Sequence, residues 1–310
     1  MHNVLARAMF LVALVTWAAV SPAAAVAPLS VAAVAPGVFV HQGVHEEATV
    51  ANQGGIANIG FVVGDAAVAV IDSGGSPAEG RALLAAVRQV TTLPVRYVIN
   101  THFHPDHVMG NAAFRSPGTI FIAHANLPRA LAARRETYLA NLAAVLGPDA
   151  VKDAIVIPDH LVAAKESIDL GHRRLDLTAY PPAHTDSDLT VLDEKTGTLW
   201  AGDLVFLERV PAIDGSILGW LKAIAALRQV EARRVIPGHG PISALWPAAL
   251  DDEQRYLQTL VVETRQLLKD GGSLTDATTK VGLSERSRWL LFDSYNARNV
   301  TAAYTELEWE

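Results

Sequence analysis

The chain has 310 residues, half of them hydrophobic and 18% charged, with a formal net charge of -7 and no cysteine. This apolar content excludes a disordered chain and allows one large domain or two medium domains with a full core. The acidic balance argues against nucleic-acid binding, and the lack of cysteine excludes disulfides, thiolate zinc sites, iron–sulfur clusters and a cysteine nucleophile.

Residues 1–25 have the layout of a secretory signal peptide. Arg7 precedes an apolar run over 8–20, and small residues follow at 21–25. Cleavage after Ala25 or Ala27 fits the preference for small residues at such sites. A membrane anchor is the alternative, but the run is shorter than the ~20 residues of a spanning helix. We therefore expect a mature, exported protein without a membrane span, periplasmic in a bacterium.

Strand and helix signals alternate along the chain up to about residue 245. Gly64-Asp65 is typical of a two-residue hairpin turn. Ser76, Pro77 and Glu79 predict a helix start, with Ser76 as N-cap and Glu79 completing a capping box. In chain order, the pattern predicts strands at 56–63 and 66–71, a helix from 77 to about 89, strands at 95–99 and 119–123, a helix over 127–146, strands at 173–177, 189–192 and 198–201, a helix over 217–230, and a strand at 235–236.

The segment 246–310 has few β signals. A helix is predicted from about 247 to 269, a break at Gly271-Gly272 follows, and further helical pieces run to the end. The alternation of strands and helices therefore predicts one α/β domain over 26–245, with 246–310 as a helical C-terminal extension packed on the same domain.

Three of the 11 histidines fall within the segment 101–107. Pro105 prevents a regular helix here, so a loop is predicted at the end of a buried strand, where α/β sheets place their sites. His102 and His104 project to the same side of an extended piece, and a turn after Pro105 aims Asp106 and His107 at a neighbouring point. A solvated His-rich loop is the alternative. We favour a metal site, because crowded histidines repel when protonated and need partners when buried.

Three further candidate ligands follow predicted strands: His184 in Ala-His-Thr-Asp, Asp203 in Ala-Gly-Asp, and His239 in Pro-Gly-His-Gly. Taken alone, each of these residues is weak evidence for a metal site, because a single histidine after a strand is usually structural. Together with the 101–107 segment they suffice for two metal sites without cysteine, built from the imidazole and carboxylate groups that bind zinc or iron.

This set of motifs, in its order and spacing, resembles the metallo-β-lactamase superfamily over Val38 to Leu245. The resemblance implies a four-layer αββα sandwich of two related β/α halves, with two zinc ions at one edge. Asp72 matches the family's strand-end aspartate, which orients ligands, although a turn-forming role is the alternative. The implied ligands are His102, His104 and His184 for the first metal, Asp106, His107 and His239 for the second, and Asp203 as the bridge, as in glyoxalase II-like hydrolases.

Such a centre implies a hydrolase. Two zinc ions hold a bridging hydroxide at neutral pH, which attacks an ester, thioester, lactone, amide or β-lactam bond. With Asp106, Asp203 and the hydroxide, the formal charge of the centre is positive, which favours an anionic small-molecule substrate. Asp106 also accepts a hydrogen bond from the hydroxide. His45 and Arg209 are candidate substrate contacts; solvent exposure of His45 and packing of Arg209 are the alternatives.

Segments 42–47, 202–206 and 298–304 are similar to one exported branch, the quinoprotein relay system zinc metallohydrolases, which are found beside genes for PQQ-dependent dehydrogenases. This likeness implies a functional link to such a dehydrogenase. The chain departs from the commonest β-lactamases, which place a cysteine on the second metal. It also departs from the glutathione-thioesterase branch, whose C-terminal helices are basic, because this tail carries Glu306, Glu308 and Glu310.

Two other functions compete with the dinuclear hydrolase. One is a mononuclear iron dioxygenase acting on persulfides, in which residues matching His102, His184 and Asp203 hold the iron and the other ligands are idle. The chain retains the residues of both sites, which favours two metals. The other is a non-catalytic periplasmic protein that binds metal or ligand in support of a dehydrogenase. The natural substrate, the metal in the cell and the oligomeric state stay open.

Overall fold

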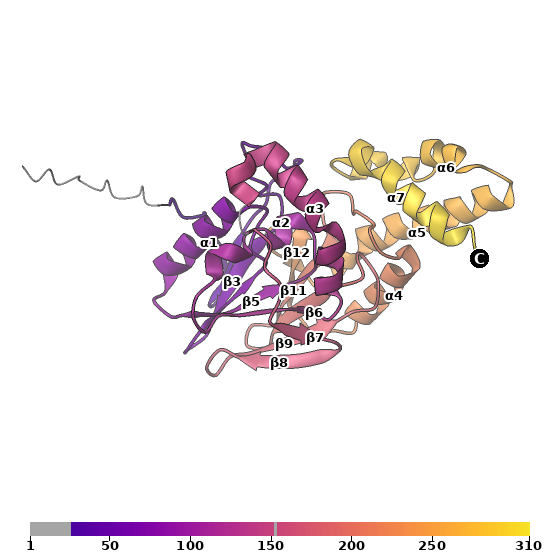
Figure 1. Ribbon diagram of the computed structural model, residues 1–310. Coiled ribbons are helices and arrows are strands. Elements are labelled where there is room, and N and C mark those ends of the chain that lie inside the picture. Colours follow the sequence, from indigo (N-terminus) through magenta and orange to yellow (C-terminus); the bar gives the residue numbers. More distant parts are fainter. Residues whose placement is uncertain (1–25, 152–153) are drawn as a thin grey trace, which may run out of the picture.

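Two β-sheets stack face to face, and helices cover their outer faces (Figure 1). This computed structural model describes residues 26–151 and 154–310; the predicted signal peptide lies outside the described residues. The arrangement is the four-layer αββα sandwich expected from the resemblance, with additional helices at the C-terminal end.

The first sheet has seven strands in sequence order. Its strands are β1 (Ala32–Ala35), β2 (Val38–His41), β3 (Ile59–Val63), β4 (Val68–Ile71), β5 (Val95–Asn100), β6 (Ile120–His124) and β7 (His160–Val162). The second sheet has six strands in the order β13-β12-β11-β10-β9-β8. These are β8 (Lys165–Asp169), β9 (Arg174–Ala179), β10 (Leu189–Asp193), β11 (Thr198–Phe206), β12 (Arg234–His239) and β13 (Ala244–Leu245).

The helices fall into three groups. Those beside the first sheet are α1 (Pro77–Val90), α2 (Pro105–Val108) and α3 (Leu127–Leu146), and α4 (Ile217–Leu227) lies on the second sheet. The C-terminal extension contains α5 (Asp251–Lys269), α6 (Leu274–Lys280) and α7 (Phe292–Leu307). Short 3₁₀ segments lie at Asn111–Phe114, Pro148–Val151, Ala248–Leu250 and Leu283–Arg288. Within the described ranges, no helix is both long and apolar enough to span a bilayer.

Alternating side chains of β4 show why the sandwich has separate cores. Val68 and Val70 belong to the cluster that packs under α1, whereas Ala69 and Ile71 belong to the cluster between the two sheets. Successive residues of a strand point to opposite faces, so a strand that is apolar at every position is buried on both sides.

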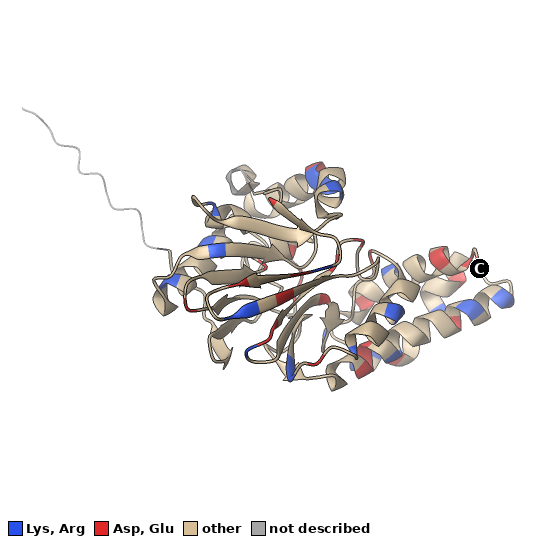
Figure 2. Cartoon of the chain, turned by 90° about the horizontal axis from the view of Figure 1, so that it is seen from below, with Lys and Arg blue, Asp and Glu red and all other residues tan. Residues whose placement is uncertain are grey.

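The C-terminal extension shares a core with the second sheet. Tyr256, Leu257 and Leu260 of α5 and Val300 of α7 join the same buried cluster as Trp220 of α4. Lys, Arg, Asp and Glu are interspersed over these helices (Figure 2). The acids of the tail have specific partners: Glu306 accepts hydrogen bonds from the Ser216 Oγ and the Ile217 N–H at the start of α4, and Glu310 pairs with Arg265.

One predicted turn is wrong, and two strands were not predicted. Val63 pairs with Val68, so the β3–β4 connection spans the four residues 64–67 rather than two. The reason is tertiary: the N–H groups of Ala66 and Ala67 donate to the Leu170 carbonyl beside the β8–β9 turn. Strands β7 and β8 were not predicted, because three residues, or an exposed edge strand of sequence KESID, carry little apolar pattern.

The predicted capping box at α1 is only half formed. The Ser76 Oγ accepts from the Glu79 N–H at 3.2 Å, as predicted. The Glu79 carboxylate, however, accepts from the Gly75 N–H at 2.7 Å instead of reaching the N-cap residue itself. The Glu79 side chain is 5% exposed and is held by the N–H of Gly75.

We expect Glu79 to make folding stability depend on pH. Burial raises the pKa of Glu79 to about 8, from an ordinary value of 4.5. Between these values the folded chain keeps a proton that the unfolded chain has lost. The free energy of unfolding therefore falls as the pH rises, by up to about 1.4 kcal/mol per pH unit from this group. Glu79→Gln should reduce the dependence of the thermal midpoint on pH between pH 5 and 8. Glu136→Gln, at an exposed position, should leave that dependence unchanged. A slope unchanged by Glu79→Gln would contradict this.

Candidate metal centre

Five separate stretches of the chain bring polar side chains to one end of the sandwich. The segment 101–107 follows β5, and the others contribute Asp72 after β4, His184 before β10, Asp203 in β11 and His239 at the end of β12. The 101–107 segment is not entirely a loop: Pro105 occupies the first position of the four-residue helix α2, where a missing N–H has no cost. This turn of helix carries Asp106 and His107.

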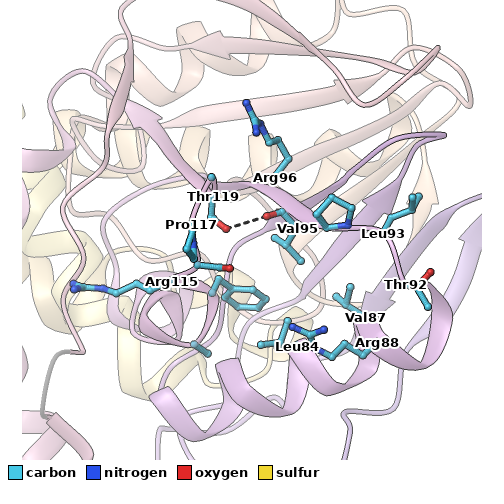
Figure 3. Close-up of a pocket in the computed structure, with 15 residues that line it drawn as sticks. Leu84, Val87, Arg88, Thr92, Leu93, Val95, Arg96, Arg115, Pro117 and Thr119 are labelled. Carbon is cyan, nitrogen blue, oxygen red and sulfur yellow. Dashed lines mark hydrogen bonds between the residues drawn. The ribbon is translucent and has the colours of Figure 1, made fainter.

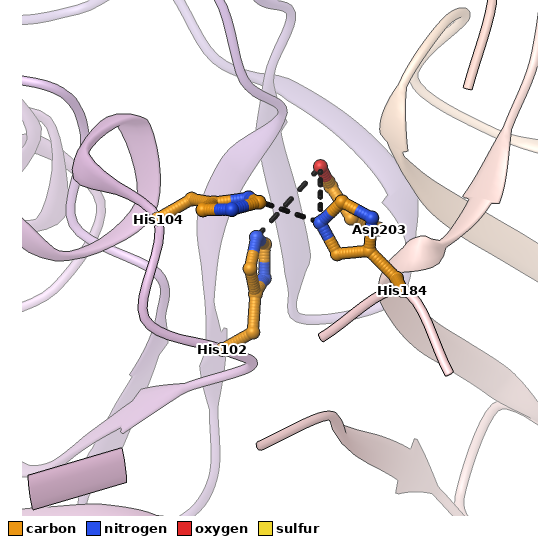
Figure 4. A group of neighbouring side chains, drawn as sticks. All are labelled: His102, His104, His184 and Asp203. Carbon is orange, nitrogen blue, oxygen red and sulfur yellow. Dashed lines mark hydrogen bonds and ion pairs between the residues drawn. The ribbon is translucent and has the colours of Figure 1, made fainter. Parts of the chain in front are cut away.

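The first group of candidate ligands contains His102, His104, His184 and Asp203, whose ligand atoms all lie within 4.8 Å of one another (Figure 4). His184 Nε2 is 3.0 Å from His104 Nδ1 and 3.4 Å from Asp203 Oδ2. His102 Nε2 is 3.7 Å from the same carboxylate oxygen. The structure therefore brings together the residues expected for a first metal, with Asp203 beside them.

The second group contains Asp106, His107 and His239. Asp106 Oδ2 is 3.3 Å from His239 Nε2 and 3.6 Å from His107 Nε2. Asp203 reaches this group as well, because its Oδ1 is 3.1 Å from His107 Nε2 and its Oδ2 is 3.3 Å from His239 Nε2. The Asp203 carboxylate therefore lies between the two groups, where a bridging ligand would have to be.

Each imidazole has one nitrogen occupied by a partner outside the two groups. The occupied atoms and partners are His102 Nδ1 with Thr101 Oγ1, His104 Nε2 with Asp214 Oδ2, His107 Nδ1 with Asp72 Oδ2, His184 Nδ1 with the Ala212 carbonyl, and His239 Nδ1 with the Ile56 carbonyl. Carbonyl and carboxylate oxygens only accept, so these nitrogens donate. Thr101 Oγ1 already donates to Asp72 and therefore accepts from His102. In the neutral form of each ring, the other nitrogen is left with a lone pair.

The lone pairs provide a test of whether a cation fits. His184 Nε2 and His104 Nδ1 face each other at 3.0 Å, and neither ring, in its neutral form, has a proton left for a hydrogen bond between them. Among the described residues, His102 Nε2, His107 Nε2 and Asp203 Oδ1 are buried without a hydrogen-bond partner. A cation between such acceptors satisfies them together, and nitrogen and carboxylate donors suit zinc or iron.

Burial and neighbouring carboxylates shift the pKa values of the candidate histidine ligands in different directions. Burial lowers the pKa of His184 to about 3 and that of His102 well below its ordinary value, so both are neutral ligand donors at pH 7. Burial would also lower the pKa of His107, but Asp203 and Asp72 raise it well above the ordinary value. Metal binding at the second group would therefore release a proton.

Asp72 has the orienting position expected for it. Its Oδ2 accepts from His107 Nδ1 at 2.7 Å, and its two oxygens accept from the Thr101 N–H and hydroxyl at 2.8 and 2.7 Å. Its φ of 53° places it in the left-handed region. Asp72 thus connects β4 to the start of the 101–107 segment and contacts one ring there.

Asp203 lies inside a strand, whereas the sequence predicted that it follows one. β11 continues to Phe206, and its pairing with β12 is irregular on both sides of Gly202. Gly202 has a φ of 53°, and a Cβ there would lie 2.5 Å from Thr101 Oγ1. Glycine therefore allows the strand to kink against the 101–107 segment, and the kink aims Asp203 at the ligands.

A cavity of about 450 Å³ opens onto the candidate ligands. Its walls include His104, Asp106, Asp203 and His239 together with Arg209. Arg209 is 4% exposed and donates to the Tyr295 hydroxyl at 2.9 Å. His45 does not line this cavity, and its Nε2 lies 3.3 Å from Glu208 Oε2.

Sequence reasoning missed several residues around this cavity. Asp214 holds His104 and lies 3.4 Å from Arg134, and Tyr295, Arg298 and Asn299 bring α7 into the cavity wall. Burial would raise the pKa of Asp214, but its hydrogen bond with His104 holds it below its ordinary value. No local pattern marks these residues. The C-terminal extension therefore forms one wall of the cavity through α7.

A second hollow lies away from the candidate ligands. It measures about 460 Å³ between α1 and the β5–β6 region, beside Leu84, Arg96 and Thr119 (Figure 3). None of the predicted site residues lines it. This hollow is therefore not part of the candidate metal centre.

Comparisons with known proteins agree with this geometry. The family model described as the metallo-beta-lactamase superfamily matches residues 52–239. A linear primary-alkylsulfatase from Pseudomonas sp. (strain ATCC 19151) is 40% identical over 47 residues, which are 15% of this chain and 9% of that protein.

Solved structures show the same fold. A double mutant of the sec-alkyl sulfatase PisA1 matches with a TM-score of 0.71 at 17% identity, over 91% of this chain and 51% of that chain. Pisa1 from Pseudomonas sp. matches with a TM-score of 0.66 at 18% identity, over 90% of this chain and 50% of that chain. A metallo-beta-lactamase from Pontibacter korlensis matches with a TM-score of 0.59 at 21% identity, over 74% of this chain and 99% of that chain. The chain thus spans about half the length of the alkylsulfatases it resembles.

Proposed function

Since the chain belongs to the metallo-β-lactamase superfamily, a family that the match over more than half its length establishes, we propose that it is a dinuclear zinc hydrolase. The observation that carries this proposal is the pair of ligand groups joined by Asp203, in which two acceptor nitrogens face each other at 3.0 Å. His102, His104 and His184 would hold one zinc ion, and Asp106, His107 and His239 the other.

When bound, a pair of zinc ions supplies an activated water nucleophile and polarises the bond to be cleaved. The protein positions the reactants. Asp106 is 17% exposed at its side chain, so one carboxylate oxygen can accept a hydrogen bond from the attacking water. Asp72 and Asp214 keep His107 and His104 in their ring orientations. The reaction class is hydrolysis of an ester, thioester, lactone or amide.

An anionic substrate is supported by the uncompensated charge of the cavity. Arg209 is buried, yet among the described residues no carboxylate lies within ion-pair distance of its guanidinium. Arg298 also lines the cavity, and no described acid pairs with it. A buried unpaired cation is costly in free energy, and a bound anion would offset that cost. We therefore assign Arg209 to the charged group of the substrate.

Arg209→Gln should weaken binding of anionic substrates selectively. Loss of a charge-assisted hydrogen bond of about 1.5–3 kcal/mol predicts that the KM of a carboxylate-bearing ester rises roughly tenfold or more relative to that of its neutral analogue. The measurement is the ratio of the two KM values in wild type and variant. Arg129→Gln, an exposed arginine outside the cavity lining, is the control. A ratio that stays the same in Arg209→Gln would refute the assignment.

Sulfate-ester hydrolysis is a second candidate. The local match to a linear primary-alkylsulfatase favours it. So does the length of the PisA1 match, because 91% of the chain is about 282 residues and must include part of the C-terminal extension, whereas the β-lactamase match covers 74%. A sulfate ester is also an anion of the kind that Arg209 and Arg298 would bind.

The proposal is tested by metal analysis of the purified chain without residues 1–25, combined with a substrate panel. We expect two zinc ions per chain and turnover of at least one member among a carboxylic ester, a thioester, a lactone, a cephalosporin and an alkyl sulfate. One iron per chain with oxygen uptake on a persulfide would replace the hydrolase with a dioxygenase. Bound metal without turnover on the whole panel would favour a non-catalytic binding protein.

Export and a link to a PQQ-dependent dehydrogenase complete the proposal. The first rests on the layout of residues 1–25, and the second on segments 42–47, 202–206 and 298–304. Two of these segments supply Asp203 and Arg298, which line the cavity. The expected results are a mature N-terminus at residue 26 or 28 in the periplasmic fraction, and weaker dehydrogenase-dependent growth after gene deletion. A full-length cytoplasmic chain, or unchanged growth, would contradict the respective part.

A further inference from the structure

The 450 Å³ cavity at the candidate metal centre is called the metal-site cavity below. A further cavity, of about 240 Å³, adjoins it on the side of α3. The two cavities share Ile56, Pro105, Asp106 and Tyr138. We call this 240 Å³ cavity the α3 pocket. Because Asp106 is a candidate ligand of the second metal, the α3 pocket begins where the reaction would take place. A molecule held at the metals can therefore extend into it.

The wall of the α3 pocket is mainly apolar. Leu142, Val145 and Leu146 are spaced three and four residues apart, so they share one face of α3, and Ala48 and Ile56 lie opposite. Val145 and Leu146 are only half-buried, so their apolar surface is available to a ligand. Apolar surface of this kind next to a polar centre is what binds an aliphatic group.

The two cavities differ in the charged side chains that line them. Among the residues that the structure describes, no lysine, arginine or histidine lines the α3 pocket, and the two carboxylates in its lining belong to Glu47 and Asp106. Glu47 Oε2 accepts from the Tyr295 hydroxyl at 3.0 Å, so it lies toward α7. The metal-site cavity contains Arg134, Arg209 and Arg298 as well as Asp106, Asp203 and Asp214, and two bound zinc ions would make its formal charge positive. An anionic group is therefore favoured in the metal-site cavity and disfavoured in the α3 pocket.

Building on the hydrolase function above, we propose that the α3 pocket binds an unbranched aliphatic arm of the substrate. The substrate class is then an anionic amphiphile. Its charged group faces Arg209 and Arg298, the bond to be cleaved lies at the two ligand groups, and its chain runs past Pro105 and Tyr138 along α3. The chemistry of the bond, carboxylic or sulfate ester, does not affect this assignment.

The test measures binding without any hydrolysis. Straight-chain carboxylates from acetate to octanoate are titrated by calorimetry into the zinc-loaded protein. Each buried methylene contributes about 0.8 kcal/mol, so we expect the affinity to rise roughly three- to fourfold per carbon until the pocket is full. Val145→Asp should flatten this series while acetate binds as in wild type. Ala144→Asp adds the same charge on the exposed neighbouring position and should leave the series unchanged.

An affinity that does not change from acetate to octanoate would overturn the inference, as would a chain-length dependence that survives in Val145→Asp. Equal flattening by Ala144→Asp would also overturn it, because the effect would then be one of charge on α3. The outcome is separate from that of the proposed function. Chain-length dependence without turnover on the panel would refute only the hydrolase, and turnover without chain-length dependence would refute only the α3 pocket.

Discussion

Replacing Asp203 with alanine should reduce hydrolysis by at least about a thousandfold, which corresponds to ~4 kcal/mol of transition-state stabilisation. Of the carboxylates in the described part of the chain, only that of Asp203 lies within 3.1–3.7 Å of ligand nitrogens from both groups. Its loss removes one donor from each proposed metal site and the negative charge that balances them. We therefore expect the zinc content to fall together with the rate, as measured by elemental analysis and turnover on the same preparation.

Asp214→Asn provides the graded control for this experiment. An asparagine oxygen can still accept from His104 Nε2, so the ring keeps its orientation and we expect a loss of about tenfold, within the range for residues that support metal ligands. Circular dichroism establishes that both variants fold. If Asp203→Ala kept two zinc ions and the wild-type rate, a bridging role for this residue would be excluded.

Removal of metal should lower the thermal midpoint of the wild-type protein. Without a cation, the facing nitrogens of His104 and His184 and the buried Asp203 carboxylate lose their shared partner. At a free zinc concentration a thousandfold above the Kd, binding stabilises the folded state by about 4 kcal/mol per site. For a chain of this size that predicts a decrease of roughly 8–16 °C for each site that chelation empties.

Two comparisons make the chelation experiment decisive. Returning zinc should restore the midpoint, and Asp203→Ala should respond much less to the chelator, because it has lost a donor at each site. Identical midpoints with and without chelator in the wild type would indicate that the two groups do not bind metal in the folded protein.

Much of the fold followed from local signals. The helix over 127–146 begins and ends as predicted, because Pro128 near its start and Gly147 after its end are strong local determinants. The capping of α1 was only partly predicted, since Gly55 and Gly74 pack closely beside the Glu79 side chain and that packing is tertiary. The length of the β3–β4 connection was missed for the same reason, because its N–H groups bond to a distant turn.

Most of the candidate ligands could be identified because they lie within a few residues of a strand end, which a sequence pattern can indicate, whereas Asp203 lies inside β11. Their partners could not. Ala212 holds His184, Ile56 holds His239 and Asp214 holds His104, from 28, 183 and 110 residues away. Nothing in the residues around Ala212 or Ile56 marks them, because the contact is made by a backbone carbonyl that every residue possesses.

The amino-acid sequence alone determined which imidazole and carboxylate groups are available as ligands, and that they would meet at one edge of a sandwich. The tertiary structure decided which nitrogen of each ring faces the centre, and that α3 and α7 form the walls beside it. The physical reason is that a histidine ring offers two nearly equivalent nitrogens, and the choice between them depends on a hydrogen-bond partner that only the folded chain brings close.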